Sequence, residues 1–402
     1  MNAQGTAFIF ILYSIISSCQ GKVSLYIRKG KKGSETMNVK RKSEVNHPLH
    51  TTTRRICKVI LLCIGFVLLF GCSRIIKSDP QNQISNTPKE YLSKTDFLLN
   101  TVVTVSLYDK QEEDLLEGCF ALIRKYEAIY SRTLESSELY ALNHGDAPIL
   151  SQSAGAITYS ISDELADIIQ SALYYSKLTG GAFDLTVAPI TSLWNFQSEE
   201  PVLPDPVKLD HALTLVDYRK VQLSGNEITF AKPGIGIDLG AIAKGYIADR
   251  LKSYLTENDV HSAIINLGGN ILCVGEKGNQ EPFVVGIQKP YAERNETAAV
   301  MKINDLSVVS SGVYERYFEL NGTVYHHILN PHTGYPYDNG LISVTILSER
   351  SVDGDGLSTS CFALGLEEGL ALIERIPNTY AVFITSDYVL HYSDGFPEVM
   401  KQ

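Results

Sequence analysis

The chain has 402 residues, of which 44% are hydrophobic and 20% charged, and its formal net charge is -10. This composition suffices for a large buried core, and the acidic balance disfavours a nucleic-acid-binding protein because phosphate binding needs a concentrated basic surface. The seven cysteines contain no CxxC pair, which disfavours a disulfide scaffold or a cysteine zinc site.

The N-terminal part of the chain is predicted to be a targeting segment. Basic residues at 54–58 precede an apolar run at 59–70, which is short for a transmembrane helix and typical of a secretory signal. The run ends at Gly71-Cys72 in a pattern that resembles a bacterial lipobox. We therefore expect Cys72 to be lipidated and to hold an exported protein at a membrane surface.

These features predict three regions. Residues 1–71 form the signal region, and within it 1–36 are expected to be an over-extended gene start, because a second apolar run lies upstream and Met37 is followed by basic residues. Residues 72–93 comprise the lipidated cysteine and a flexible polar tether. Residues 94–402 form one domain, since no linker interrupts them.

The domain is predicted to belong to the α+β class. Its strands and helices mix without a regular βαβ alternation, so a Rossmann sheet is not indicated. Ser162 is a candidate N-cap for the second helix, which Gly180-Gly181 ends. In chain order the expected elements are a strand at 97–108, helices at 111–130 and 163–178, a hairpin at 221–230, a helix at 241–254, strands at 263–266 and 283–287, a hairpin of 314–320 with 324–329, a strand at 341–347, helices at 354–364 and 367–376, and short strands near 381 and 389.

Two glycine-containing segments in the first half of the domain could contact a ligand. In 179–186 a glycine pair permits close backbone approach, while Phe183 offers an aromatic face and Asp184 an acceptor. The alternative there is a helix C-cap before a core phenylalanine. In 236–245 a helix start with Lys244 suits a phosphate and Asp238 a ribose, a base or a metal-bound water. The alternative there is an Asp–Lys surface pair.

Three further segments in the second half carry candidate groups. Residues 266–270 form either a simple turn or a close approach to a ligand. His327 precedes a rigid turn and could act as a general base, whereas joint metal binding with His326 is disfavoured because neighbours on a strand face opposite ways. Asp355 and Thr359 share a helix face and suit Mg²⁺ or Ca²⁺, or else form a helix N-cap region.

Taken together and in order, these segments resemble the ApbE family of bacterial FAD:protein FMN transferases over about residues 97–395. The matching pieces are 181–184, 238–245, 266–269, 310–314, 327–334 and 355–359. The resemblance implies an α+β domain of two lobes with mixed sheets and FAD in the cleft between them.

The resemblance also implies the site residues. It implies FAD contacts by Leu99, Ala182, Phe183, Asp184, Asp238, Lys244 and Leu329, a Mg²⁺ site of the Ala241 backbone oxygen with Asp355, Ser358 and Thr359, and His327 as the catalytic base. The chain departs from the family pattern at Leu99-Asn100, where Met-Gly is frequent, at Val313, where an acidic residue is common, and at Gly354, where Ala is usual. The first departure weakens the case for Leu99, and Gly354 with Gly356 is expected to loosen the metal-binding helix.

The function that the resemblance implies is Mg²⁺-dependent transfer of FMN from FAD onto a Thr or Ser hydroxyl of an acceptor flavoprotein subunit, with release of AMP. One alternative is an FAD pyrophosphatase, which would use the same residues with water as acceptor. Another is a non-catalytic flavin-binding lipoprotein. The presence of His327 beside Asp355 and Thr359 argues against this last alternative, because storage needs no base.

Overall fold

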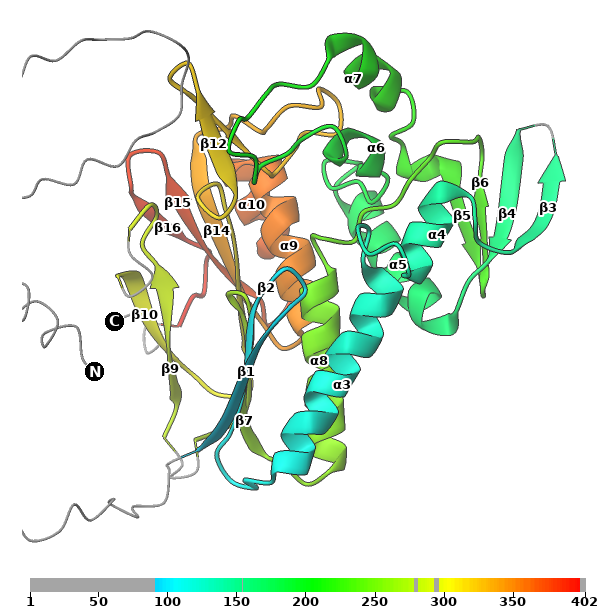
Figure 1. Cartoon of the computed structure of the whole chain (residues 1–402). Helices are drawn as coiled ribbons and strands as arrows, with labels where there is room; N and C mark the ends of the chain where they lie inside the picture. Colours follow the sequence, from blue (N-terminus) through cyan, green and yellow to red (C-terminus); the bar gives the residue numbers. More distant parts are fainter. Residues whose placement is uncertain (1–90, 154, 278–280, 293–295, 398–402) are drawn as a thin grey trace, which may run out of the picture. The chain divides into compact units, whose positions relative to one another are not determined.

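The centre of the described structure is an antiparallel sheet of eight strands in the order β1-β2-β7-β8-β11-β14-β15-β16 (Figure 1). The computed structural model describes residues 91–153, 155–277, 281–292 and 296–397, which lie in one unit spanning Asn86–Gln402. The strands of this sheet are β1 (Leu92–Leu98), β2 (Thr101–Leu107), β7 (Ser262–Leu267), β8 (Asn270–Gly275), β11 (Ser307–Gly312), β14 (Leu341–Ser348), β15 (Tyr380–Thr385) and β16 (Leu390–Tyr392).

The first two strands correct one prediction. The segment 97–108, expected as a single strand, contains a hairpin turn at Leu99-Asn100, where both residues have φ 55° and Leu98 pairs with Thr101. Two-residue turns with positive φ suit the twist of paired strands. Strand β1 also includes the last two residues of the expected tether, which therefore ends before Leu92.

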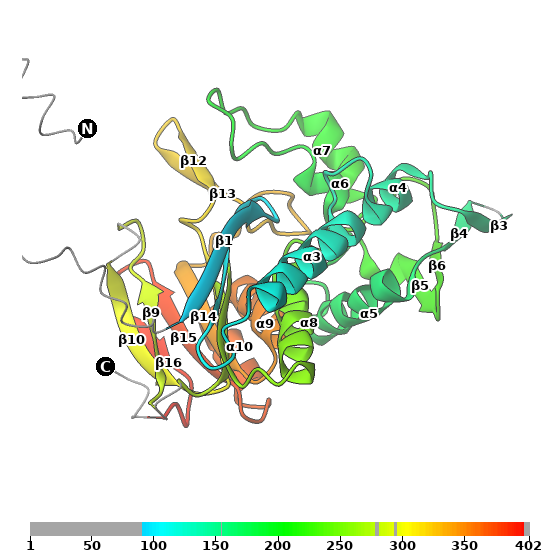
Figure 2. The same cartoon turned by 60° about the horizontal axis from the view of Figure 1, so that its bottom comes forward.

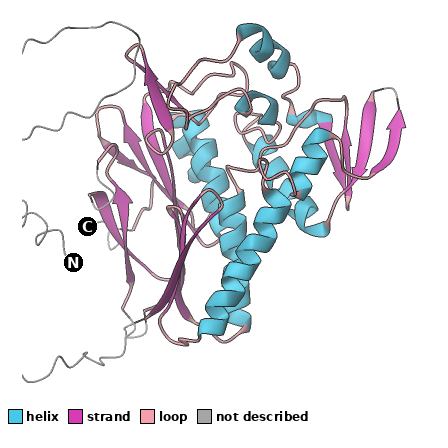
Figure 3. Cartoon of the chain, in the orientation of Figure 1, coloured by secondary structure: helices cyan, strands magenta, loops and turns pink. Residues whose placement is uncertain are grey.

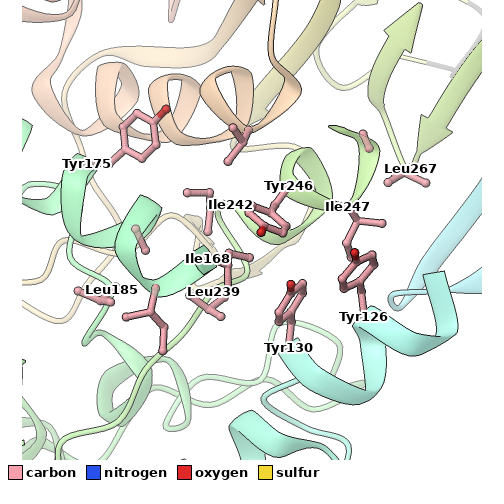
Figure 4. Packing of buried hydrophobic residues seen from close by; sticks show 14 of the residues in the cluster. Tyr126, Tyr130, Ile168, Tyr175, Leu185, Leu239, Ile242, Tyr246, Ile247 and Leu267 are labelled. Carbon is pink, nitrogen blue, oxygen red and sulfur yellow. The ribbon is translucent and has the colours of Figure 1, made fainter. Parts of the chain in front are cut away.

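Helices cover one face of the central sheet (Figure 3). Within this layer α3 and α8 lie side by side, and Figure 4 shows Tyr130 of α3 beside Tyr246 of α8, with ring centroids 5.8 Å apart. The Ser162 hydroxyl caps α5 by accepting from the Leu165 amide, as predicted. The helices next to the sheet are α3 (Glu113–Tyr130), α8 (Ala243–Glu257), α9 (Ser351–Leu364) and α10 (Leu366–Ile373). Beyond them, α4 (Glu138–His144) packs against α3, and α5 (Asp163–Leu178) packs against α3 and α9.

The opposite face of the sheet is covered by the hairpin of β9 (Phe283–Gln288) and β10 (Thr297–Ile303). Successive residues of β7 show the two sides, because Ile265 packs in the helical core and Ile264 against the second core. This alternation is the period of a strand with both faces covered.

Smaller elements complete the described structure (Figure 2). The hairpin expected at 314–320 with 324–329 is shorter than predicted, and the one expected at 221–230 is present. These elements are the sheet β3-β4-β6-β5, made of β3 (Ile149–Ser153), β4 (Ala156–Ser160), β6 (Glu227–Phe230) and β5 (Val221–Ser224), the hairpin of β12 (Tyr317–Leu320) and β13 (Thr323–His326), and the short helices α6 (Ala188–Thr191), α7 (Pro206–Leu213) and η2 (Tyr218–Lys220).

Glycines bring α9 close to its neighbours. A Cβ atom on Gly245 of α8 would lie 2.2 Å from the Ser351 carbonyl oxygen, one on Gly354 2.5 Å from Val309, and one on Gly356 2.4 Å from Tyr175. Gly354 and Gly356, which were expected to loosen this helix, allow α9 to pack against β11 and α5 at distances that a larger side chain would block.

The targeting prediction concerns residues outside the described ones. The apolar run 59–70, Cys72, the expected gene start and nearly all of the tether fall there. Within residues 91–397, as far as they are described, no helix combines the length and the apolar composition that a bilayer-spanning segment needs.

The N-terminus of α9 is capped from α8. The Asp249 carboxylate accepts hydrogen bonds from the backbone amides of Ser351, at 2.7 Å, and Val352, at 2.9 Å. These amides have no partner within their own helix. Burial raises the pKa of Asp249 to about 6, and the two amide hydrogen bonds oppose this rise.

We predict that Asp249 makes stability depend on pH. Its folded pKa of about 6 lies above the usual aspartate value of about 3.9, so the stability that protonation contributes is fully present below pH 4 and is lost as pH rises through 6. Asp249→Asn removes this titration. The free energy of unfolding of the wild type relative to Asp249→Asn should therefore fall by about 2–3 kcal/mol between pH 4 and 7.

Urea unfolding at several pH values measures this difference. Asp210→Asn on the exposed side of α7 serves as the control and should leave the pH dependence unchanged. A constant difference between wild type and Asp249→Asn across this range would contradict the prediction.

Candidate active site

A cavity of about 300 Å³ brings together most of the residues predicted for the site. It is lined by residues of the loop before α6, the segment leading into α8, the end of β11, the chain on either side of the β12–β13 hairpin, and α9. The predicted residues that line it are Ala182, Phe183, Asp184, Asp238, Ala241, Lys244, His327, Leu329, Asp355 and Thr359.

Two predicted residues are not among those that line the cavity. Leu99 lies in the turn between β1 and β2, where its amide donates to the Glu127 carboxylate of α3 at 2.8 Å. The buried Ser358 hydroxyl donates to the Asp355 carbonyl at 3.1 Å and contacts the Ser311 hydroxyl at 2.9 Å. In this structure Ser358 therefore supports the helix that carries Asp355.

The Asp355 carboxylate is buried and firmly held. One oxygen accepts from the Gly245 amide at 2.6 Å and the other from the Asn270 side chain at 3.0 Å. Burial raises the pKa of Asp355, and the positive charge of Lys244 and these two hydrogen bonds oppose the rise. Among the described residues no cationic side chain forms an ion pair with it.

These surroundings fit a hard divalent cation. The Asp355 carboxylate, the Thr359 hydroxyl and Ala241 all line the same cavity, and carboxylate, hydroxyl and carbonyl oxygens are the ligands that Mg²⁺ prefers. The part of the chain that the structure describes has no cluster of three or more His, Cys, Asp or Glu side chains. A cation here would accordingly depend on neutral oxygens as well as on Asp355.

His327 faces the cavity in a neutral state. Its Nδ1 lies 3.3 Å from the Arg316 carbonyl oxygen, which can only accept, so this hydrogen bond places the proton on Nδ1 and leaves Nε2 with a free lone pair. Enclosure by the cavity walls, and then the charge of Arg316, lowers the pKa of His327 to about 3. The imidazole is thus a proton acceptor at neutral pH.

The neighbouring His326 points elsewhere, as the strand pattern predicted. It is buried, its Nε2 bonds to the Tyr337 carbonyl at 2.9 Å, and its Nδ1 accepts from the Ile328 amide at 3.3 Å. Both ring nitrogens are used within the protein, so His326 has no free group for a ligand.

Two cationic side chains and one carboxyl group stand near His327. Lys244, Glu315 and Arg316 line the cavity, and neither cation forms an ion pair within the described residues. Desolvation raises the pKa of Glu315 although part of its surface is accessible, while Lys244 opposes the rise. The sequence analysis missed Glu315 and Arg316, although they directly follow the matched segment 310–314.

Asp238 is paired with an arginine that the sequence analysis missed. One carboxylate oxygen lies 3.0 Å from the Arg132 Nε and accepts from the Thr191 hydroxyl at 2.8 Å, and the other accepts from the Gly240 amide at 2.9 Å. The alternative of an Asp–Lys pair is therefore not what the structure has. Arg132 follows α3, about a hundred residues away, and no local pattern connects it to Asp238.

The Asp184 carboxylate forms its hydrogen bonds with neighbouring residues of the protein. Its oxygens accept from the Thr186 amide at 2.8 Å, the Thr186 hydroxyl at 2.6 Å and the Tyr218 amide at 2.9 Å. Burial raises its pKa, which these hydrogen bonds oppose. Asp184 thereby fixes the loop that presents Ala182 and Phe183 to the cavity.

One part of the cavity wall is aromatic. Phe183, Trp194, Phe196 and Tyr337 line it, and two of them are held by hydrogen bonds to backbone carbonyls. The Tyr337 hydroxyl donates to Ala182 at 3.0 Å and the Trp194 indole to Gly334 at 2.9 Å. Rigid aromatic walls of this kind suit a flat ring system.

Comparison with known proteins identifies the family of the chain. The model of the ApbE family matches residues 99–384. The FAD:protein FMN transferase of Treponema pallidum is 35% identical over 334 residues, covering 78% of this chain and 89% of that protein. The one of Klebsiella pneumoniae is 36% identical over 292 residues, covering 72% and 88%. The crystal structure of the ApbE protein of Thermotoga maritima superimposes with a TM-score of 0.67 at 28% identity and covers 76% of this chain and 98% of that one. The chain belongs to the ApbE family.

Proposed function

We propose that this protein is an FAD:protein FMN transferase that uses Mg²⁺ to move the FMN part of FAD onto a Thr or Ser hydroxyl of an acceptor protein. Flavin transfer follows from the family and from the names of its relatives. One observation supports the finer proposal: a single cavity contains a neutral imidazole, a set of hard oxygen donors, and two cations that form no ion pair with any residue the structure describes.

The cavity offers complementary surfaces to the parts of FAD. The aromatic wall of Phe183, Trp194 and Tyr337 suits a planar ring system, and Lys244 and Arg316 attract the diphosphate. Lys244 lies in the first turn of α8, where the helix dipole adds positive potential.

The residues around His327 support nucleophilic attack by a hydroxyl. Its Nε2 would take the proton of the acceptor Thr or Ser, whose oxygen then attacks the phosphorus next to riboflavin. The bond from this phosphorus to the AMP oxygen breaks, AMP leaves, and a phosphodiester joins FMN to the acceptor. When bound by Asp355, Thr359 and the Ala241 carbonyl, Mg²⁺ would neutralise charge on the diphosphate.

The low pKa of His327 is compatible with a role as general base only if bound substrate raises it. A group with a pKa of about 3 is a weak base, but two of the causes are the positive charges of Arg316 and Lys244. A bound diphosphate would compensate those two charges and so raise the pKa of His327 from this value, while burial, the largest cause, continues to lower it.

We also propose where the enzyme acts, from the sequence alone. The signal region and the lipobox-like Cys72 indicate an exported lipoprotein anchored to a membrane and facing the periplasm or the cell exterior. Its acceptors would then be exported or membrane-bound flavoprotein subunits that expose a Thr or Ser.

Intact mass measurement tests the proposed reaction. Protein purified from Ser73 onward is incubated with FAD, Mg²⁺ and an acceptor domain that carries a flavinylation site, while AMP is quantified. A gain of one FMN residue on the acceptor, matched by AMP, is expected. AMP with an unmodified acceptor would indicate the pyrophosphatase, and bound FAD without either product would indicate a flavin carrier.

We predict that His327→Ala slows transfer about 10²–10⁴-fold, the usual contribution of a positioned base, and changes FAD affinity little. Single-turnover kinetics and FAD titration measure the two effects. His332→Ala, at an exposed histidine of the following turn, is the control and should transfer normally. Unimpaired transfer by His327→Ala would exclude the base role.

We predict that Asp355→Asn strongly weakens activation by Mg²⁺. The substitution keeps the size of the side chain and removes the only carboxylate among the proposed ligands, so the Mg²⁺ dependence of the rate should shift to much higher concentration. The rate is measured against Mg²⁺ concentration, with the exposed Asp210→Asn as control. A wild-type Mg²⁺ profile in Asp355→Asn would rule out this metal site.

A further inference from the structure

We infer that Asn270 is a positioning residue, which orients the Asp355 carboxylate toward the cation through a buried chain of hydrogen bonds. The inference rests on the proposed metal site. Asn270 is the first residue of β8 and has 1% of its surface exposed. It does not line the cavity, so it acts only through Asp355.

The Asn270 amide is fixed by two different partners. Its nitrogen donates to one Asp355 oxygen at 3.0 Å, and its oxygen accepts from the Ser351 hydroxyl at 2.8 Å. Rotation of the amide by half a turn would place its oxygen against the carboxylate. The carboxylate can only accept, so the observed orientation is the one that satisfies both groups.

The chain continues to the central sheet. The Ser351 hydroxyl has one hydrogen, which it donates to Asn270. In the 2.9 Å hydrogen bond between Ser307 and Ser351, the donor is therefore the Ser307 hydroxyl. The Ser307 hydroxyl also lies 3.2 Å from the Ile271 carbonyl of β8. Ser307 and Ser351 are both fully buried, and Asn270 and Asp355 nearly so. In an environment this dry a hydrogen bond is hard to replace by water.

Both oxygens of the Asp355 carboxylate are held by hydrogen bonds. The Gly245 amide of α8 fixes one oxygen at 2.6 Å, and Asn270 fixes the other. Each carboxylate oxygen keeps a second lone pair, so the group can still bind a cation. Partners that orient a ligating carboxylate typically contribute 10–100-fold to metal affinity.

A second asparagine of the β7–β8 hairpin, Asn266, can be compared with Asn270. Asn266 of β7 accepts from the Gly269 amide at 3.0 Å, and among the described residues the hydrogen bonds of the Asp355 carboxylate come from Gly245 and Asn270 instead. This hydrogen bond lies within the β7–β8 turn. If Asn270 were likewise only a turn residue, the two asparagines would affect metal binding equally little.

The experiment measures Mn²⁺ affinity directly. Mn²⁺ is titrated into the protein with and without FAD, and free Mn²⁺ is followed by electron paramagnetic resonance. Asn270→Leu removes both hydrogen bonds at similar volume, and Ser351→Ala removes the hydroxyl that donates to the amide and accepts from Ser307. Asn266→Ala is the control in the hairpin. Ser360→Ala is the control on α9, because the Ser360 hydroxyl has no hydrogen-bond partner in the described part of the chain.

We expect Asn270→Leu to raise the Mn²⁺ dissociation constant at least tenfold. Ser351→Ala should raise it less, both controls should leave it unchanged, and Asp355→Asn should remove binding. The melting temperature without metal shows whether each variant is folded. If Asn270→Leu does not fold, the Mn²⁺ dissociation constant of Ser351→Ala, compared with that of Ser360→Ala, tests the inference alone.

Two outcomes overturn the inference and differ from each other. Wild-type affinity in Asn270→Leu and Ser351→Ala, together with loss of binding in Asp355→Asn, would refute the role of Asn270 and leave the metal site in place. Absence of Mn²⁺ binding by the wild type, with or without FAD, would refute the metal site and the inference together.

Discussion

The buried carboxylate of Asp355 is the interaction on which the arrangement of the site depends. It joins α9 to α8 through the Gly245 amide and to the central sheet through Asn270. A buried charge without an ion pair is costly unless hydrogen bonds compensate it. The close approach of the two helices supplies such compensation, and a side chain on Gly245 would prevent it because the Ser351 carbonyl occupies that position.

A second carboxylate makes this approach possible. Asp249 on α8 caps the first amides of α9 and sets where that helix begins. From this start, Asp355 and Thr359 follow one turn apart and both reach the cavity. The two helices are therefore held by carboxylates in opposite directions, Asp249 reaching from α8 to α9 and Asp355 from α9 to α8. Positional precision of this kind is what a site that works through electrostatics requires.

Local patterns predicted those parts of the structure that depend on neighbours in sequence. Helix 163–178 and its Ser162 cap, and the opposite directions of His326 and His327, follow from capping and from strand alternation. The β1–β2 turn was missed because Leu99-Asn100 carries no glycine, which usually marks positive φ. The pairing of Arg132 with Asp238 and the role of Gly356 depend on contacts between distant segments, which no spacing rule encodes.

The electrostatics of the cavity explain why the base and the substrate depend on each other. Burial together with the charges of Arg316 and Lys244 lowers the pKa of His327, and under the proposed function the same two cations would bind the diphosphate. Without substrate the imidazole is unprotonated but weakly basic, so it is poorly suited to activate water or a stray hydroxyl. A diphosphate between the cations removes part of the field that lowers its pKa. Under the proposed function, His327 would therefore become a better base once the phosphorus to be attacked is in place, so that FAD binding itself would activate the base.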